Sequence, residues 1–370
     1  MAEQTAAGSA IDGAVDGLAC VRDGAAGIVT LSRPEKRNAL TIAARGNLLA
    51  NLPMFAREPL VYAVVLRSAV DGIFCAGGDV VEMASLADRD MEAAEKALAD
   101  ELSLVWHAEC FTKPTVSLID GAVIGGGNGI TRFGTHRVAG ERYRFAMPET
   151  GIGLFPNNGL AHAFARMPRD IGMYLALTGE TVGRADAYHL GLVTHCIPAD
   201  EFKAITAALV DADPVDALLD PLHVEPGPGP LLALGDVITR CFGAGTVMEI
   251  VARLAHETGA HAEWAAATRA QLLARSPTAL VVTHRLVREA SAKELRDVLE
   301  LEHALICRMM ELPDVHAGVR ARLGKTGDAP RWRPARLDDV SCATIDAIFS
   351  GPEEHHLRLP TRKEMQEAKM

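Results

Sequence analysis

The sequence predicts an α/β core followed by a region made almost entirely of helices. Up to about residue 210, short apolar and β-branched runs alternate with helical stretches, as in α/β proteins. Residues 211–234 then contain five prolines and two glycines, which predicts a linker or a long loop. Beyond this segment, apolar residues recur at helical spacing as far as residue 311.

The two ends of the chain differ in composition from its centre. The first residues are small, polar and acidic, without the features of a signal or transit peptide, so we expect a disordered lead-in and a cytoplasmic location. The last residues are highly charged, which favours a disordered tail. The expected parts are a lead-in at 1–17, a core at 18–210, a linker at 211–234, a helical region at 235–351 and a charged tail at 352–370.

Each element of this plan has its own signal. Apolar and β-branched runs predict strands, while capping residues and apolar spacings of three and four predict helices. The expected strands are 27–31, 61–67, 115–119, 143–147 and 192–197. The expected helices of the core are 42–49, 79–88, 91–110, 158–166, 170–178 and 183–190. Those of the C-terminal region are 235–242, 245–258, 261–275, 278–290 and 293–311, with an extended strap around Trp332.

Composition excludes several classes of function. With 49% hydrophobic residues among 370, the chain can bury a large core. Its 37 basic and 48 acidic residues give a net charge of −11, which argues against nucleic-acid binding. No apolar run approaches the length of a membrane span. Neither H-E-x-x-H nor G-x-S-x-G occurs, so we predict no metal site and no serine-hydrolase triad.

Two glycine-rich turns are the first candidate functional feature. The run Gly125, Gly126, Gly127, Asn128, Gly129 follows a buried strand and precedes an apolar segment. Residues Phe74 to Asp79 repeat this arrangement with two glycines and an acidic helix start. Glycines allow close approach to backbone N–H groups, which attract an oxygen that carries negative charge. The two turns can converge on one oxygen, or they can be unrelated tight turns.

Glu149 is the second candidate. It is the only acidic residue between Glu141 and Asp170, and its neighbours, such as Met147 and Ile152, are mostly apolar. Desolvation raises the pKa of such a carboxyl group and suits it to act as a base or a nucleophile. An isolated glutamate is more often a surface loop residue, but the preceding glycine run favours a chemical role.

The third candidate is the basic cluster Arg33, Lys36 and Arg37. Composition alone predicts a solvated turn at this position.

The stretches GAVIGGGNG (121–129) and FAMPETGIGLFP (145–156) resemble the signature of the crotonase, or enoyl-CoA hydratase/isomerase, superfamily. The chain is most similar to its 3-hydroxyisobutyryl-CoA hydrolase branch, and the resemblance covers roughly residues 18–340. It includes SPTAL (276–280) and RWRPA (331–335) near the C-terminus. The resemblance implies a crotonase-like spiral of ββα units.

The resemblance also implies an acyl-CoA substrate, with coenzyme A as part of the substrate and no separate cofactor. The N–H groups of Gly78 and Gly126 would form an oxyanion hole for the thioester carbonyl, and the 33–40 turn would contact the nucleotide end of coenzyme A. The implied substrate-binding residues are Arg33, Lys36, Arg37, Ala39, Ala76, Asp79 and Gly125. Crotonases commonly form trimers through C-terminal helices, so the resemblance allows a homo-oligomer.

Two positions bear on the reaction type. Hydratases of the superfamily use two glutamates, and the position of the first is Gly129 here, which argues against hydratase activity. The hydrolase branch normally has an aspartate eight residues after Glu149, where this chain has Asn157. An amide can orient a water or a hydroxyl group but cannot take up a proton at neutral pH.

Three functions therefore stay open. The first is a thioesterase for a short 3-hydroxyacyl-CoA, such as 3-hydroxyisobutyryl-CoA, with Glu149 as nucleophile or base and Asn157 as orienting residue. The second is an enoyl-CoA isomerase that uses Glu149 as its single acid and base. The third is a catalytically weak acyl-CoA-binding protein. The whole-chain resemblance favours the first.

Overall fold

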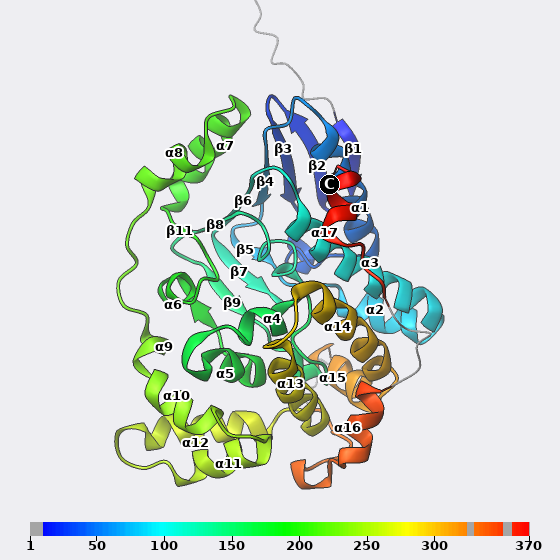
Figure 1. Ribbon diagram of the computed structural model, residues 1–370, viewed down its shortest axis with the longest axis vertical. Coiled ribbons are helices and arrows are strands. Elements are labelled where there is room, and N and C mark those ends of the chain that lie inside the picture. The colour runs from blue at the N-terminus through cyan, green and yellow to red at the C-terminus, as the bar shows by residue number, and fades with distance from the viewer. Residues whose placement is uncertain (1–9, 324–328, 351–356, 370) are drawn as a thin grey trace, which may run out of the picture.

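The computed structural model describes residues 10–323, 329–350 and 357–369. Its two sheets are layered beside helices in the upper part of Figure 1, and further helices fill the lower part. The seven-stranded sheet has the order β1-β2-β3-β4-β6-β8-β11, and the four-stranded sheet has the order β10-β9-β7-β5.

The larger sheet is antiparallel at one end and parallel elsewhere. Strands β1 to β3 pair antiparallel, and β3, β4, β6, β8 and β11 pair parallel. Its strands are β1 (Ala10–Val15), β2 (Leu18–Asp23), β3 (Ala26–Leu31), β4 (Ala63–Ser68), β6 (Thr115–Ile119), β8 (His136–Ala139) and β11 (His195–Cys196). All five residues of β6 are buried, as expected for a parallel strand covered on both faces.

The smaller sheet makes the chain a spiral of ββα units. Each of its three parallel strands follows a strand of the larger sheet after a few residues: β5 follows β4, β7 follows β6, and β9 follows β8. Helical segments come next in each case. The strands are β5 (Gly72–Cys75), β7 (Gly121–Ile124), β9 (Arg144–Ala146) and the antiparallel β10 (Val182–Gly183). The predicted fold class is confirmed.

Helices of the core begin where capping residues predict them. The side chains of Thr41, Asp79 and Asp90 accept backbone N–H groups at the starts of α1, α2 and α3. The helices of this part are α1 (Ile42–Arg57), α2 (Val80–Ala87), α3 (Met91–Cys110), α4 (Leu160–Phe164), α5 (Ile171–Thr178), α6 (Arg184–His189) and α7 (Phe202–Val210).

The C-terminal helices share one core with the sheets. Leu31, Phe155, Leu280 and Leu305 belong to a single cluster of buried apolar residues. The helices predicted between 235 and 311 are confirmed to within a few residues, whereas α15 and α16 were not expected. The helices are α10 (Gly235–Phe242), α11 (Val247–His256), α12 (Ala262–Leu273), α13 (Pro277–Ala290), α14 (Leu295–Met310), α15 (Pro313–Leu323) and α16 (Cys342–Phe349).

The prediction of a linker or a long loop at 211–234 is wrong in part. This segment contains the short helices α8 (Val215–Leu219) and α9 (Pro230–Ala233), joined by an extended stretch along one side of the molecule (Figure 1). Val215 and Leu219 are buried against residues of the larger sheet. Prolines at positions 214 and 230 mark helix starts, where a missing N–H group costs nothing.

The lead-in prediction is wrong for residues 10–17, and residues 1–9 lie outside the described part. Strand β1 pairs with β2 through a turn at Asp16 and Gly17, whose φ values are 47° and 78°. An Asp-Gly pair with two positive φ angles is the preferred short hairpin turn. This local signal outweighs the polar composition on which the prediction rested.

The tail prediction is wrong for residues 357–369, and residues 351–356 lie outside the described part. Helix α17 (Arg362–Glu367) lies beside α1 and α3 (Figure 1). Leu359 and Met365 are buried in a cluster with Trp106. The Trp106 indole N–H donates to the carbonyl of Pro360 at 2.7 Å. Two apolar anchors therefore fix a segment that looks disordered by its charge.

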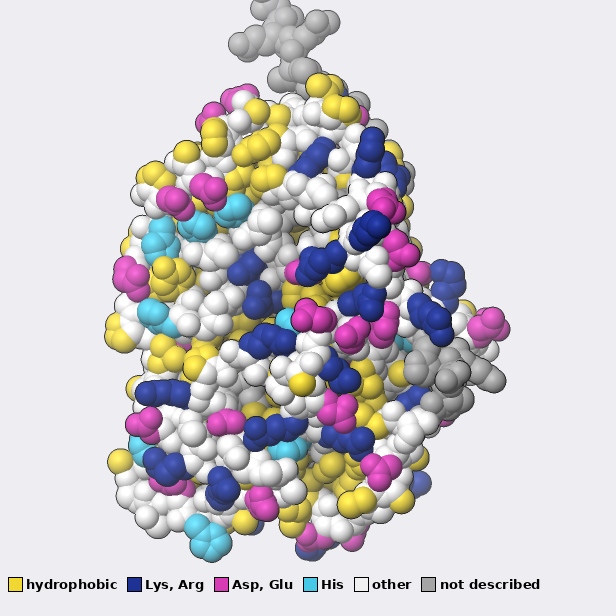
Figure 2. Space-filling view, in the orientation of Figure 1, with side chains coloured by type: hydrophobic (Ala, Val, Ile, Leu, Met, Phe, Trp, Pro, Cys, Tyr) yellow, Lys and Arg dark blue, Asp and Glu magenta, His cyan; other side chains and the backbone are white. Residues whose placement is uncertain are grey.

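Basic and acidic side chains are interspersed over the face shown in Figure 2. Among the described helices, none has the length and apolar character that crossing a bilayer requires. All seven cysteines lie in the described residues and carry free thiols.

Candidate active site

Three parallel strands place the candidate residues at one edge of the smaller sheet. The turn at Cys75 to Asp79 follows β5, the 3-10 turn Gly125–Gly127 follows β7, and the turn Glu149–Ile152 follows β9 soon after. Because β5, β7 and β9 are parallel neighbours, the turns that follow them lie together. The structure thus brings Gly78, Gly126 and Glu149 together at one pocket.

The two glycine turns are in direct contact. A Cβ atom placed on Gly126 would lie 3.2 Å from the backbone nitrogen of Gly78, and one on Gly77 would lie 3.3 Å from the nitrogen of Gly126. Hydrogen bonds of Leu40 N to Gly77 O and of Asp79 N to Leu40 O fix the first turn. Among the described residues, no backbone acceptor is hydrogen-bonded to the N–H of Gly78 or Gly126. Both glycines line the pocket.

Glu149 is a buried carboxyl group beside these turns. It is 9% exposed, and its Oε1 lies 2.9 Å from the position of a Cβ atom on Gly125. Its Oε2 has no hydrogen-bond partner among the described residues. The pKa of Glu149 is raised to about 8, chiefly by burial; its own backbone N–H and the charge of Arg322 lower the pKa, and the charge of Glu101 raises it. A carboxyl group with this pKa exchanges a proton near neutral pH.

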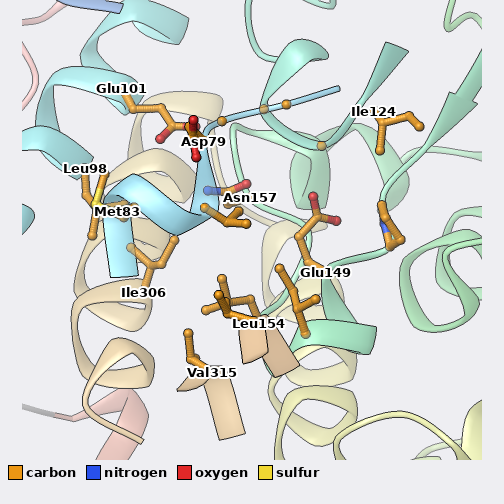
Figure 3. Close-up of a pocket in the computed structure, with 18 of the residues that line it drawn as sticks. Asp79, Met83, Leu98, Glu101, Ile124, Glu149, Leu154, Asn157, Ile306 and Val315 are labelled. Carbon is orange, nitrogen blue, oxygen red and sulfur yellow. The ribbon is translucent and has the colours of Figure 1, made fainter. Parts of the chain in front are cut away.

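Asn157 lines the same pocket and is 9% exposed. Its Oδ1 accepts a hydrogen bond from Asn158 Nδ2 at 2.8 Å. Figure 3 shows Asn157, Asp79 and Glu101 on one side of the pocket, with Glu149 across from them.

The pocket is a cavity of about 140 Å³, and one water needs roughly 10–15 Å³ of such space. It can thus hold a small acyl group. Its lower part in Figure 3 is apolar and comes largely from the C-terminal helices. The apolar lining residues include Met83, Leu98, Ile152, Leu154, Ile306, Met310, Val315 and Val319.

The predicted substrate-binding residues fall into two groups. Ala76, Asp79 and Gly125 line the pocket. Arg33, Lys36, Arg37 and Ala39 do not line it, but their turn adjoins it, because Ala76 N donates to Arg37 O at 3.0 Å.

Within this turn, Arg33 is already engaged. Its Nη1 contacts the carbonyl of Ala39 at 3.1 Å and Asp79 Oδ2 at 3.3 Å. Lys36 and Arg37 are exposed to solvent.

The sequence interpretation missed the buried ion pair between Arg45 of α1 and Glu101 of α3, which joins Arg45 Nη1 to Glu101 Oε2. Both residues line the pocket. Glu101 stands three residues after Leu98 and one before Leu102, on the apolar stripe of its helix. A charged residue on such a stripe signals a buried partner or a site.

Glu302 of α14 was also missed. It is fully buried, and its Oε2 accepts the backbone N–H of Gly159 at 2.8 Å. Burial raises its pKa to about 8. It does not line the pocket but supports the turn that carries Asn157 and Asn158. Its spacing from Val298, Leu299 and Leu305 on an apolar stripe is the signal that could have identified it.

In the described part of the chain, no group of three or more His, Cys, Asp or Glu side chains is placed to hold a metal ion.

Comparisons with known proteins agree with this architecture. Residues 26–349 match the family described as Enoyl-CoA hydratase/isomerase. The 3-hydroxyisobutyryl-CoA hydrolase, mitochondrial, of Danio rerio is 33% identical over 91% of this chain and 90% of its own length. The 3-hydroxyisobutyryl-CoA hydrolase 1 of Arabidopsis thaliana is 33% identical over 91% of this chain and 93% of its own.

Two solved structures are similar over nearly the whole chain. A carnitinyl-CoA dehydratase from Mycobacterium thermoresistibile has a TM-score of 0.87 and 35% identity, covering 93% of this chain and 99% of its own. An enoyl-CoA hydratase from Rhodobacter sphaeroides 2.4.1 has a TM-score of 0.86 and 32% identity, covering 93% of this chain and 100% of its own. The fold, the family match and these relatives together establish that the chain is an enzyme and belongs to the crotonase, or enoyl-CoA hydratase/isomerase, family.

Proposed function

We propose that this enzyme hydrolyses the thioester of a short 3-hydroxyacyl-CoA, with 3-hydroxyisobutyryl-CoA as the first candidate. The observation that carries the proposal is the buried carboxyl group of Glu149 beside two glycine N–H donors in one small pocket. Relatives named 3-hydroxyisobutyryl-CoA hydrolase, similar along nearly the whole chain, support the same reaction.

In this proposal the N–H groups of Gly78 and Gly126 bind the thioester oxygen. Attack on the carbonyl carbon turns that oxygen into an oxyanion, and two preorganised donors stabilise it. Removal of one such donor typically slows a reaction roughly 10²–10³-fold. The close contact of the two turns supports a shared ligand atom.

Glu149 then acts as general base or as nucleophile. As a base, its carboxylate removes a proton from water, the water oxygen attacks the carbonyl carbon, and the C–S bond breaks. The leaving thiolate takes the proton back from Glu149. As a nucleophile, a carboxylate oxygen attacks the carbonyl carbon and releases the thiolate, and water then cleaves the resulting anhydride. A single turnover in H₂¹⁸O distinguishes them, because only the nucleophilic route can place ¹⁸O in the Glu149 side chain.

The phosphates of coenzyme A need local positive charge on a chain whose net charge is −11. Lys36 and Arg37 are exposed beside the pocket turn, whereas Arg33 is held by Asp79 and Ala39. We therefore assign the phosphate contacts to Lys36 and Arg37, with Arg33 supporting the turn.

A second candidate is proton chemistry at the carbon atoms of an enoyl-CoA. Glu149 alone would serve a double-bond isomerase, and Asn157 cannot exchange a proton. The pocket also holds a second carboxylate, Glu101, which could assist addition of water, although Arg45 is paired with it.

Product analysis separates these functions. The enzyme is incubated with 3-hydroxyisobutyryl-CoA, a 2-enoyl-CoA and a 3-enoyl-CoA, and products are followed by free thiol and by mass spectrometry. Free coenzyme A in step with loss of the 3-hydroxyacyl thioester is expected. A shifted double bond or a hydrated thioester without free thiol would replace the proposal with the second candidate. Binding without turnover would reduce the protein to a weak acyl-CoA binder.

A further inference from the structure

A chain of polar contacts runs from the first helix to the wall of the pocket. Arg45 is paired with Glu101 Oε2, and Glu101 Oε1 accepts a hydrogen bond from Asn158 Nδ2 at 3.1 Å. The same Nδ2 donates to Asn157 Oδ1 at 2.8 Å. All four side chains are buried.

Each contact fixes the polarity of the next one. The guanidinium group of Arg45 only donates hydrogen bonds, so Glu101 faces it with an accepting oxygen, Oε2. The other oxygen of Glu101, Oε1, accepts from Asn158, which therefore turns its NH₂ group toward Glu101. The same NH₂ group also donates to Asn157, so Asn157 accepts this hydrogen bond with its carbonyl oxygen, Oδ1.

The consequence concerns the other end of the Asn157 amide. With Oδ1 held by Asn158, the NH₂ group of Asn157 has no hydrogen-bond acceptor among the described residues, and Asn157 lines the pocket. Figure 3 shows Asn157 in the same pocket as Glu149. The pocket therefore offers a donor where an aspartate would offer an acceptor.

We propose that Asn157 donates a hydrogen bond to an oxygen on the acyl group, with Arg45, Glu101 and Asn158 as positioning residues that fix this donor. The inference rests on the proposed function and narrows its substrate class. A 3-hydroxyl oxygen and a 3-oxo oxygen both accept a hydrogen bond, so the enzyme takes 3-hydroxyacyl and 3-oxoacyl thioesters alike. An unsubstituted acyl group leaves the buried donor unpaired.

Three matched thioesters test the wild-type enzyme: 3-hydroxybutyryl-CoA, 3-oxobutyryl-CoA and butyryl-CoA. We expect similar kcat/KM values for the first two, both exceeding that of butyryl-CoA roughly 5- to 150-fold, the range for leaving one buried polar group unpaired. Equal rates for 3-oxobutyryl-CoA and butyryl-CoA would overturn the donor assignment.

Asn157→Asp replaces the donating NH₂ group by an accepting oxygen and leaves the size of the side chain unchanged. An ionised aspartate accepts from a 3-hydroxyl but repels a 3-oxo oxygen, so the ratio of kcat/KM for the 3-oxo over the 3-hydroxy thioester should fall by a similar factor. An unchanged ratio in a folded variant would contradict the proposal.

Asn158→Gly tests the positioning residues. Asn158 has a φ of 59°, a conformation that glycine adopts without strain, so the backbone should survive. The Asn157 amide is then free to rotate and can present either end. The preference of 3-oxobutyryl-CoA over butyryl-CoA should shrink, an effect that a purely structural role for Asn158 would not produce.

If none of the thioesters releases coenzyme A, the proposed hydrolase function fails, and the donor is tested by binding instead. Titration calorimetry should then show tighter binding of 3-oxobutyryl-CoA than of butyryl-CoA to wild type, and loss of that difference in Asn157→Asp. Equal affinities in wild type would overturn the inference.

Discussion

Glu149 and Glu302 are both buried carboxyl groups, but they differ in what faces them. Among the described residues, one oxygen of each has no hydrogen-bond partner, but Glu149 lines the pocket, whereas Glu302 does not and its other oxygen accepts the backbone N–H of Gly159. The pKa of each is raised to about 8, chiefly by burial. The burial of the Glu149 carboxyl group could be predicted from the sequence, because the residue is an isolated acid among apolar neighbours. The Arg45–Glu101 pair could not, because its partners are 56 residues apart on separate helices.

The raised pKa of Glu149 predicts a pH dependence for the proposed reaction. As a base or nucleophile it must be ionised, so kcat/KM should rise with pH and level off above about 8. Glu149→Gln should lower kcat/KM roughly 10²–10⁴-fold and abolish this rise. Steady-state kinetics between pH 6 and 9 measure both effects. A rate that falls across the same range would assign Glu149 the role of an acid instead.

Glu302 should couple stability to pH. Its pKa is raised from 4.5 to about 8 on folding. Between these values the unfolded chain releases the proton while the folded protein keeps it, so stability falls as pH rises. Glu302→Gln removes this group but retains an oxygen for the Gly159 N–H. The loss of thermal stability from pH 5 to 9 should therefore be smaller in the variant than in wild type. Parallel curves would show that Glu302 does not titrate in this window.

At the scale of elements, the two glycine turns are positioned by neighbouring parallel strands. The sequence predicts both turns and most helices, because glycine runs, caps and helical spacing are local signals. It does not predict the short strands β5, β7 and β10, since two to four residues carry too little periodicity. It also misplaces the linker and tail, where a few buried residues such as Leu219 and Met365 outweigh composition.

The two glycines should respond differently to a methyl group. A Cβ on Gly126 would lie 2.9 Å from Glu101 Oε1, which Arg45 and Asn158 hold in place, and 3.2 Å from Gly78 N. Gly126→Ala should therefore disturb the donor pair and lower kcat roughly 10²–10³-fold. Gly78→Ala should cause a smaller loss, because among the described residues its Cβ would meet Arg45 Nη1 alone, at 3.6 Å, an ordinary contact. Equal losses in the two variants would contradict this geometry.

Helix α17 should contribute measurably to stability. Met365 is buried with Trp106 and Leu359, so Met365→Ala should lower the free energy of unfolding by about 2–5 kcal/mol. Gln366→Ala changes an exposed position of the same helix and should be nearly neutral. Urea unfolding of both variants measures the difference. A neutral Met365→Ala would show that the segment does not dock in solution.

At the scale of the whole molecule, the C-terminal helices complete the site. Ile306 and Met310 of α14 and Val315 and Val319 of α15 line the pocket opposite the glycine turns. Helix α15 packs on the Glu149 turn, since a Cβ on Gly318 would meet the backbone of Ile152 within 2.6 Å. The α/β part and the helical part thus form this pocket together. A homo-oligomer and a cytoplasmic location stay predictions.

The central claim is that Glu149 in this pocket cleaves an acyl-CoA thioester. The most direct test is the release of free coenzyme A from 3-hydroxyisobutyryl-CoA by wild type and by Glu149→Gln, with folding and coenzyme A binding verified for both. Rapid release by wild type and near-background release by the variant is the predicted result. Equal release by the two proteins, or consumption of the substrate without free thiol, would contradict the account.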